Sequence, residues 1–397
     1  MSDSPALRRH ISSLIPPWAR SVIRRAPLVS PAWRRAWAKS RDFVGDPNYD
    51  LAAVDRSFAD RRGAPIDDHA ILERVSASYD KAKLAQKAKG SSFHPSNEWL
   101  PIYEAELAAV MRALSTGDLE ALGRLYRNFF RESCSAGLVG VTDDMKRDFF
   151  NGRISGLSRR LFLNDSIHRY RLWKGLLGNA HKVSELEAPA IGNPFGVFVD
   201  GAFVYCGFYQ HYYAAQISRL VKRRPRPIVV ELGGGYGGMA YFLIRDNPNV
   251  AYVDFDLPEN MALTAYYLLR AFPQRRVLLY GEGELNAEAL KEHSIVVMPS
   301  FEMSKLDDLS VDCAFNSYSL AEMSPETIKT FVGEFSRVVR GHILHVNHNR
   351  KSVVRADDFG IDPELFDLVY KTPALWNLGR DAGMDEYEYL YARVEGR

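Results

Sequence analysis

The chain has 397 residues, which is long enough for two domains with sizeable hydrophobic cores. It carries 51 Lys and Arg against 49 Asp and Glu, and a formal net charge of +2 argues against a nucleic-acid partner. The three cysteines are widely spaced and odd in number, so the sequence predicts neither a disulfide framework nor a zinc site. Pro16 and Pro17 interrupt the early apolar stretch, and no apolar run approaches the length of a membrane span, so we expect a cytoplasmic protein.

Residues 1–60 are predicted to form a basic N-terminal arm. Residues 1–41 carry nine Lys or Arg against one acid, Asp3, with tryptophans interleaved. Such a pattern can lie on an anionic membrane surface, where cations meet lipid phosphates and indoles occupy the interface. Several prolines interrupt any long helix, which is typical of a loosely packed arm. The sequence leaves open a peripheral contact with the inner face of the membrane.

Residues 61–190 are predicted to be mainly helical. Residues 70–89 are rich in Ala, Leu and Lys, and residues 100–114 carry apolar side chains at helical spacing. Residues 90–95 between them have the composition of a loop. We interpret this region as a helical lid or as a dimerisation region, in which case the protein is a homo-oligomer.

The pattern changes at residue 191, where a turn and then a hairpin up to residue 204 are predicted. A helix over residues 208–221 follows, with Tyr212 and Tyr213 among its aromatic side chains. Aromatic residues at this spacing are more often core, but sugar rings also stack on such faces and tyrosine hydroxyls bind sugar hydroxyls. Both tyrosines are therefore candidate substrate contacts.

Residues 228–238 predict a strand, a tight turn and the start of a helix. Gly233, Gly235 and Gly238 satisfy the dinucleotide pattern G-x-G-x-x-G, while Glu231 with Gly233, Gly235 and Gly237 satisfies the E-x-G-x-G-x-G pattern of S-adenosylmethionine methyltransferases. A carboxylate before the first glycine can accept hydrogen bonds from a methionine ammonium group, whereas it would repel a pyrophosphate. The acid therefore favours S-adenosylmethionine over NAD as the cofactor.

The next predicted strand, residues 250–258, contains two acids. A carboxylate at the end of this strand can accept hydrogen bonds from both ribose hydroxyls of either cofactor. We choose Asp256 for this role and keep Asp254 in reserve, because strict alternation puts both on one face.

Further strands are predicted at residues 276–280, 295–300, 311–316, 342–349 and 387–394, with helices at residues 259–272 and 325–339. The tail at residues 357–380 is predicted to be helical in part. The fold class that follows is α/β, with a Rossmann-like class I methyltransferase sheet over residues 191–397 whose terminal strand is antiparallel. A mainly helical N-terminal region precedes it.

Ligands of an open α/β sheet lie outside the carboxyl ends of the strands. Residues 316–322 follow such a strand, so we expect them to face the reacting methyl group and its acceptor. Asn316 is a candidate cofactor contact, and Tyr318 and Asn347 are candidate substrate contacts.

Several segments together resemble the sugar O-methyltransferases of bacterial surface-polysaccharide clusters. They are residues 127–129, 192–196, 211–214, 231–237 and 316–323, and the resemblance covers roughly residues 125–394. It implies transfer of a methyl group from S-adenosylmethionine to a sugar hydroxyl of a glycan or glycan precursor. The segment at residues 255–258 is also similar to the ribose-binding tetrapeptide of plant small-molecule O-methyltransferases, which supports Asp256 by analogy.

One position departs from what this resemblance implies. Methyltransferases of this class usually have an acid after the third strand that meets the adenine amino group, but here Ser300 occupies that position and Phe301 follows. The Ser300 hydroxyl or backbone groups could bind the adenine, with Phe301 covering the ring.

A sugar hydroxyl is a weak nucleophile until a base takes its proton. Candidate bases are His348, Glu322 and His211, in that order, and for each the alternative is a structural hydrogen bond. The histidines at positions 342, 345 and 348 alternate between two faces of a strand, so a three-histidine metal site is not expected.

Two other functions stay open: an NAD(P)-dependent oxidoreductase acting on a sugar nucleotide, and a catalytically silent partner in glycan assembly.

Overall fold

The computed structural model describes residues 31–63, 67–97, 99–139, 149–151, 154, 156–178, 180–205, 207–349, 354–375 and 385–394. The first 30 residues of the predicted basic arm lie outside this range. In the part of the chain that is described, no helix is both long and apolar enough to cross a bilayer.

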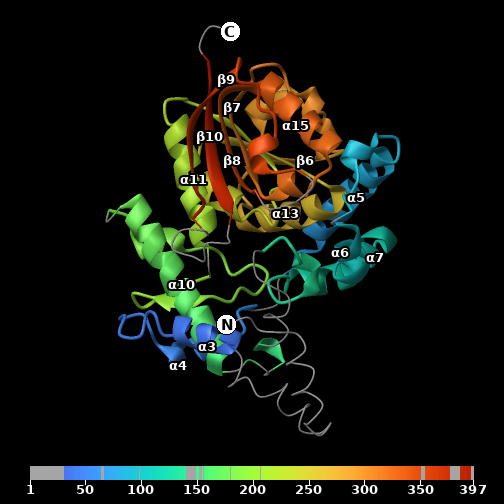
Figure 1. Ribbon diagram of the computed structural model, residues 1–397. Helices are drawn as coiled ribbons and strands as arrows, with labels where there is room; N and C mark the ends of the chain where they lie inside the picture. The colour runs from blue at the N-terminus through green and yellow to red at the C-terminus, as the bar shows by residue number, and fades with distance from the viewer. Residues whose placement is uncertain are drawn as a thin grey trace, which may run out of the picture.

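An eight-stranded sheet forms the centre of the molecule (Figure 1). Its strands lie in the order β5-β6-β4-β3-β7-β8-β10-β9. Their bounds are β3 Ile228–Leu232, β4 Ala251–Asp256, β5 Val277–Leu279, β6 Ile295–Pro299, β7 Val311–Ser317, β8 Val339–His348, β9 Phe366–Pro373 and β10 Glu386–Arg393. Neighbouring strands from β5 to β8 are parallel, and β10 is antiparallel to both β8 and β9. The predicted Rossmann-like sheet with an antiparallel final strand is therefore confirmed.

Helices cover both faces of this sheet, because successive side chains of its central strands point to opposite sides. Val229 belongs to the core on one face and Val230 to the core on the other. The first core includes side chains of α11 Phe208–Val221, α12 Gly238–Asp246 and α13 Pro258–Ala271. The second includes side chains of α14 Ala287–Glu292 and α15 Pro325–Val338. With both faces covered, the strand ends are where polar groups can meet a ligand.

Among the helices that precede the sheet, α5 packs against α13 (Figure 1), whereas α3 and α4 pack against α10, which contacts α11. Their bounds are α3 Pro31–Lys39, α4 Leu51–Ser57, α5 His69–Gln86, α6 Leu100–Ala105, α7 Ala108–Thr116, α8 Leu119–Tyr126 and α10 Gly156–Leu177. Short 3-10 turns η2 Ser91–Phe93, η3 Ser133–Ser135 and η4 Val183–Leu186 connect them, and β1 Val197–Val199 and β2 Ala202–Val204 form the predicted hairpin. The buried side chains of the helical region are continuous with the core beneath α11 to α13.

A buried carboxylate attaches the helical region to the sheet. Asp68, just before α5, accepts hydrogen bonds from Tyr266 Oη at 2.8 Å and from Arg270 Nη1 at 3.3 Å, both on α13. Arg127, at the end of α8, donates to the same carboxylate through Nε at 3.1 Å. Burial raises the pKa of Asp68, but the hydrogen bonds from Arg127 and Tyr266 outweigh it and hold the pKa below its usual value. The ionised carboxylate thus links α5, α8 and α13.

The tail differs from its prediction. Within residues 357–380, the described part contains the short 3-10 turn η7 Ala356–Asp358 and the edge strand β9, and no α-helix. Val369, Tyr370 and Thr372 have high strand propensity, and β10 offers a free edge with which they pair. Long-range pairing explains why the local pattern misled.

Candidate functional site

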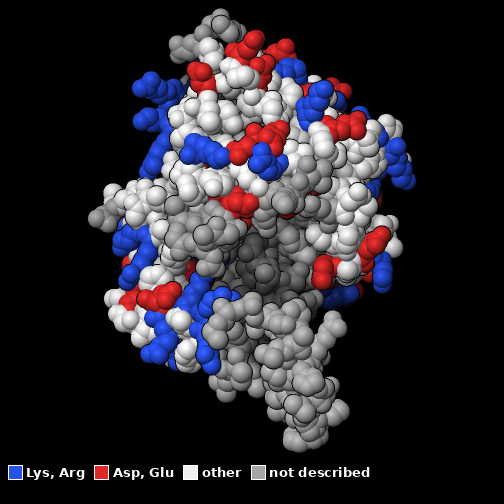
Figure 2. Space-filling view, in the orientation of Figure 1, with Lys and Arg blue, Asp and Glu red and all other residues white. Residues whose placement is uncertain are grey.

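A cavity of about 780 Å³ opens at the carboxyl ends of the parallel strands. Residues that follow β3, β4, β6 and β7 line it, together with residues 91–92, 94–97 and 99 of the helical region and the start of α15. Figure 2 shows Lys and Arg close to Asp and Glu over the described part of one face of the molecule, in small groups of both signs. On the described residues of this face, charges of both signs are mixed, and a polyanion would meet no surface of a single sign there.

The glycine turn forms the wall of the cavity after β3. Gly233 and Gly235 line it with φ of 80° and 62°, a region that residues with a side chain rarely adopt. A Cβ on Gly233 would come within 2.5 Å of Ser319 Oγ. Gly237, with φ of 88°, begins α12 and faces Leu268 and Thr264 of α13. Glycine suits positions 233 and 235 because both have positive φ, and because a Cβ on Gly235 would also come within 3.0 Å of the Leu138 carbonyl oxygen.

Glu231 is buried at the end of β3 and lines the same cavity. Tyr252 Oη donates a hydrogen bond of 2.6 Å to its carboxylate. Burial raises the pKa of Glu231 to about 8, the Tyr252 hydrogen bond opposes this rise, and the nearby Asp256 charge adds to it. A cation placed beside this carboxylate would restore its ionised form.

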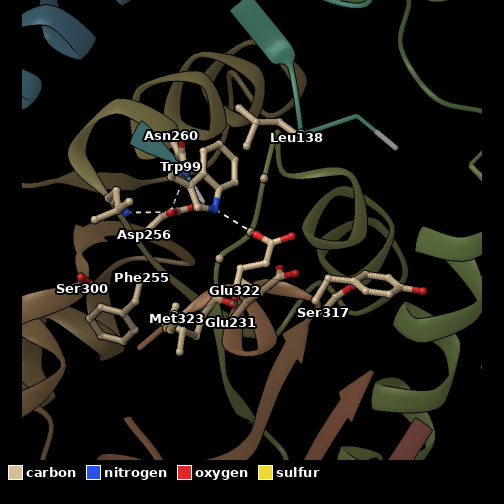
Figure 3. A pocket seen from close by; sticks show the side chains of 18 of the residues that line it. Trp99, Leu138, Glu231, Phe255, Asp256, Asn260, Ser300, Ser317, Glu322 and Met323 are labelled. Atoms are coloured by element: carbon tan, nitrogen blue, oxygen red, sulfur yellow. Dashed lines mark hydrogen bonds between the residues drawn. The ribbon is translucent and has the colours of Figure 1, made fainter. Parts of the chain in front are cut away.

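Asp256 ends β4 and also lines the cavity. Its Oδ1 accepts hydrogen bonds from the Leu257 backbone at 2.6 Å and from Asn260 Nδ2 at 3.1 Å, as Figure 3 shows. Burial raises the pKa of Asp256 to about 7. Asp254, two residues earlier, accepts from the Gly234 backbone at 3.1 Å and lies outside the cavity lining. Asp256 is thus directed at a ligand, while Asp254 holds the glycine turn.

Ser300 and Phe301 point in different directions. Ser300 lines the cavity beyond Asp256 (Figure 3). Phe301 does not, because its ring packs edge-on against Phe93 and Tyr280, with centroids 6.3 and 5.7 Å away. The aromatic ring that lines this part of the cavity from the sheet is Phe255, so the expected role of Phe301 as a cover for the cofactor ring is not supported by its position.

Asn316 and Asn347 are fully buried and lie outside the cavity lining. Asn316 Nδ2 donates to the Leu232 carbonyl at 2.8 Å, and Asn347 Nδ2 donates to Asn316 Oδ1 at 2.9 Å. Asn347 Oδ1 accepts from the backbone of Ala321 at 3.2 Å. The two amides therefore fix the turn η6 Ser319–Glu322, and neither reaches a ligand directly.

Tyr318 lines the cavity with an unusual backbone, φ 66° and ψ −31°. Its Oη donates to Glu386 Oε2 at 3.2 Å, and its ring lies nearly parallel to that of Tyr209, with centroids 6.2 Å apart. Tyr209 Oη and Ser317 Oγ share a hydrogen bond of 2.6 Å. A non-glycine residue held at positive φ in a cavity is typical of functional sites.

Tyr212 and Tyr213 are buried and do not line the cavity. They lie one turn further along α11 than Tyr209, and the carboxylate near them is Glu388 of β10. The sequence identified an aromatic helix but not which of its faces meets the cavity. Tyr209 and Glu386 were missed as site residues, because no spacing rule links a helix at 208–221 to the last strand.

Of the three candidate bases, Glu322 lines the cavity. Trp99 Nε1 donates to Glu322 Oε2 at 2.9 Å, so an indole from the helical region fixes the carboxylate (Figure 3). His348 ends β8 directly opposite Glu386 in the β8–β10 ladder but is not among the lining residues.

His211 lies away from the cavity. Trp173 Nε1 donates to its Nδ1 at 3.0 Å, and its Nε2 faces the carboxylates of Glu185 and Asp246 at 3.8 and 3.9 Å. Burial lowers the pKa of His211 to about 4. A buried, neutral imidazole outside the cavity is a structural residue, so we no longer count His211 among the bases.

The described residues contain no group of three or more His, Cys, Asp or Glu placed to hold a metal ion. The residues that do converge suit a ligand that carries an ammonium group and a ribose, as S-adenosylmethionine does. Glu231 would take the ammonium group and Asp256 the ribose hydroxyls.

The sequence matches no protein-family model and no curated protein. Among solved structures, the chain is similar to the N-methyltransferase NodS from Bradyrhizobium japonicum WM9 in complex with S-adenosyl-L-homocysteine, with 12% identity, 57% of this chain and 100% of that chain covered, and a TM-score of 0.34. It is also similar to magnesium protoporphyrin IX methyltransferase (ChlM) from Synechocystis PCC 6803 with bound SAM, with 11% identity, coverage of 64% and 99%, and a TM-score of 0.33. Likenesses this distant carry no argument about function, which must come from the site itself.

Proposed function

We propose that this protein is an S-adenosylmethionine-dependent O-methyltransferase that acts on a sugar hydroxyl of a glycan or glycan precursor. The observation that carries the proposal is the pair of buried carboxylates, Glu231 and Asp256, on either side of a glycine turn in one cavity. Glu231, just before the glycine turn, would face the pyrophosphate of a dinucleotide, which disfavours the oxidoreductase alternative, whereas Asp256 suits the ribose of either cofactor.

The cofactor supplies a methyl group on a positively charged sulfur. Glu231 binds its ammonium group, and Asp256, oriented by Asn260, accepts hydrogen bonds from its ribose hydroxyls. Because Gly233 and Gly235 have no side chains, the cofactor can lie close to the backbone of the turn. Ser317 and Glu322 line the cavity at the end of β7, where they would lie beside the reacting methyl group.

The acceptor occupies the part of the cavity beyond β7. Trp99, Tyr209 and Tyr318 offer aromatic surfaces there, and Ser317 and Glu386 offer groups that can hydrogen-bond to hydroxyls. This combination of rings with a few polar groups suits a sugar, whose C–H face stacks on an aromatic ring while its hydroxyls bind polar atoms.

Glu322 is the base that the geometry favours. Its carboxylate takes the proton of the acceptor hydroxyl as the new O–C bond forms and the S–C bond breaks. The thioether leaves uncharged, so no acid is needed, and Trp99 Nε1 keeps the carboxylate in place through the reaction. His348 is the alternative base. It is not among the residues that line the cavity, so it would have to reach the acceptor from behind them.

Transfer of a labelled methyl group tests the proposal. Purified protein and labelled S-adenosylmethionine are incubated with nucleotide sugars, lipid-linked glycan precursors and finished polysaccharide in parallel. We expect label on a sugar oxygen in one of these classes and a rate of labelling lowered by about 10²-fold or more with Glu322→Gln. Binding of S-adenosylhomocysteine without transfer to any sugar class would instead favour the catalytically silent partner.

A further inference from the structure

The strand order places the proposed cofactor contacts in a row. Ser300 follows β6, Asp256 ends β4 and Glu231 lies on β3, and these three strands are neighbours in the sheet. Neighbouring strands are about 4.8 Å apart. A cofactor bound through its ammonium group at Glu231 and its ribose at Asp256 would therefore direct its adenine to Ser300. This step depends on the proposed cofactor.

The helical region, together with the sheet, closes the end of the cavity next to Ser300, where the adenine would bind. Phe93 of η2 packs edge-on against Phe301 and Phe331, with centroids 6.3 and 6.0 Å away. Gln86 Nε2, at the end of α5, donates to the Phe93 carbonyl at 2.6 Å. Because Phe301 directly follows Ser300, this docking brings the adjacent Ser91 and Ser92 to the same end of the cavity, and both line it.

The chemistry of this end matches the edge of adenine. The adenine amino group is a donor and its ring nitrogens are acceptors, and a serine hydroxyl can serve as partner to either. The rings of Phe255 and Phe331 line the same cavity and offer apolar surface on which adenine could pack.

We infer that Ser91 and Ser92 of the helical region, together with Ser300, recognise the adenine of the cofactor. Hydroxyl groups would then take the place of the acid that the resemblance leads one to expect after β6. The helical region is then part of the cofactor site, and its segment at residues 91–97 must be docked through Phe93 for tight binding.

Two ligands that differ only in the edge of the base test this inference. S-adenosylhomocysteine and S-inosylhomocysteine, in which an oxo group replaces the amino group, are titrated calorimetrically into the wild type, Ser91→Ala/Ser92→Ala and Ser300→Ala. Ser304→Ala is the matched control, because Ser304 belongs to the same turn η5 Ser300–Lys305, is exposed and does not line the cavity.

The wild type should prefer the adenosyl ligand. Losing one or two neutral hydrogen bonds should weaken its binding to the double variant and to Ser300→Ala by about fivefold to tenfold each and reduce that preference. The control should bind like the wild type, and unchanged thermal unfolding shows that each variant is folded. Wild-type affinity and preference in both serine variants would overturn the inference while leaving the proposed cofactor in place. Failure of the folded wild type to bind S-adenosylhomocysteine would overturn the proposed function itself.

Discussion

The two ends of the cavity are built in different ways. At the cofactor end, Glu231 and Asp256 belong to one continuous strand, turn, helix and strand, so local sequence fixes their relative positions. At the acceptor end, Trp99, Tyr209 and Glu386 come from three distant parts of the chain and meet only through tertiary packing. The contacts with the ammonium group and the ribose of the cofactor should therefore respond to changes in one short segment, whereas acceptor chemistry should respond to changes throughout the molecule.

Replacement of the proposed base should separate the two ends most strongly. Glu322→Gln keeps the size of the side chain but removes the proton acceptor, so kcat should fall by about 10²-fold to 10⁴-fold. The dissociation constant of S-adenosylhomocysteine should not change, because Glu322 is not among the proposed cofactor contacts. Labelled-methyl transfer and calorimetry measure the two quantities. The control is Glu326→Gln, a change at an exposed position in the first turn of α15. An unchanged kcat in Glu322→Gln would instead make His348 the proposed base.

A side chain in the glycine turn should affect the cofactor end. In Gly233→Ala the new Cβ meets Ser319 Oγ at 2.5 Å and the residue must keep φ at 80°. A turn that shifts to relieve this strain must return to its native form when the ligand binds, so strain of about 1–3 kcal/mol corresponds to a loss of about fivefold to 150-fold in affinity for S-adenosylhomocysteine, which calorimetry measures. Gly117→Ala is the control, since it has φ of 65° but open space around its Cβ. Equal affinities in Gly233→Ala and the wild type would mean that no ligand meets this turn.

The raised pKa of Glu231 predicts a proton released on binding. At neutral pH the free protein holds this carboxyl mostly protonated, because burial raises its pKa to about 8. A bound ammonium group favours the carboxylate, so the pKa falls and affinity should increase as the pH rises toward 8, then level off. Calorimetry near pH 7 in two buffers of different ionisation enthalpy measures the proton. Glu231→Gln should lose this release, and a wild type that exchanges no proton would contradict the ammonium contact.

The smallest effect on activity should come from His211→Phe. The change removes the acceptor of the buried Trp173 Nε1–H, so the free energy of unfolding should fall by about 1–3 kcal/mol. The kcat of the folded variant should equal that of the wild type. A large fall in kcat with unchanged stability would restore His211 as a candidate base.

The same contrast explains what the sequence could predict. The helix at residues 208–221 was predicted with the bounds it has, and the sheet class followed from the alternation of apolar runs and helical patterns. Glu231 and Asp256 could be singled out because a turn and a strand end place them by spacing alone. The helix, the glycine turn and the strand end depend on contacts between residues close in sequence, and the sheet class follows from the order of such local elements.

Positions that depend on packing were not predictable. Whether Tyr209 or Tyr212 faces the cavity depends on how α11 rotates against the sheet, and whether Phe301 covers a ligand depends on where Phe93 docks. Trp99 could not be linked to Glu322, because the two are 223 residues apart and are joined by a single side-chain hydrogen bond. Edge strand β9 likewise formed only because β10 was there to pair with it.

The most direct measurement is a calorimetric titration of the full chain with S-adenosylhomocysteine and, separately, with NAD, repeated on Glu231→Ala. Glu288→Ala, a change in an exposed ion pair with Lys291, is the matched control. We predict micromolar binding of S-adenosylhomocysteine, no binding of NAD, and a loss of about tenfold or more in Glu231→Ala alone, as expected for a charge-assisted contact. A folded wild type that binds NAD and not S-adenosylhomocysteine, or neither ligand, would contradict the methyltransferase assignment.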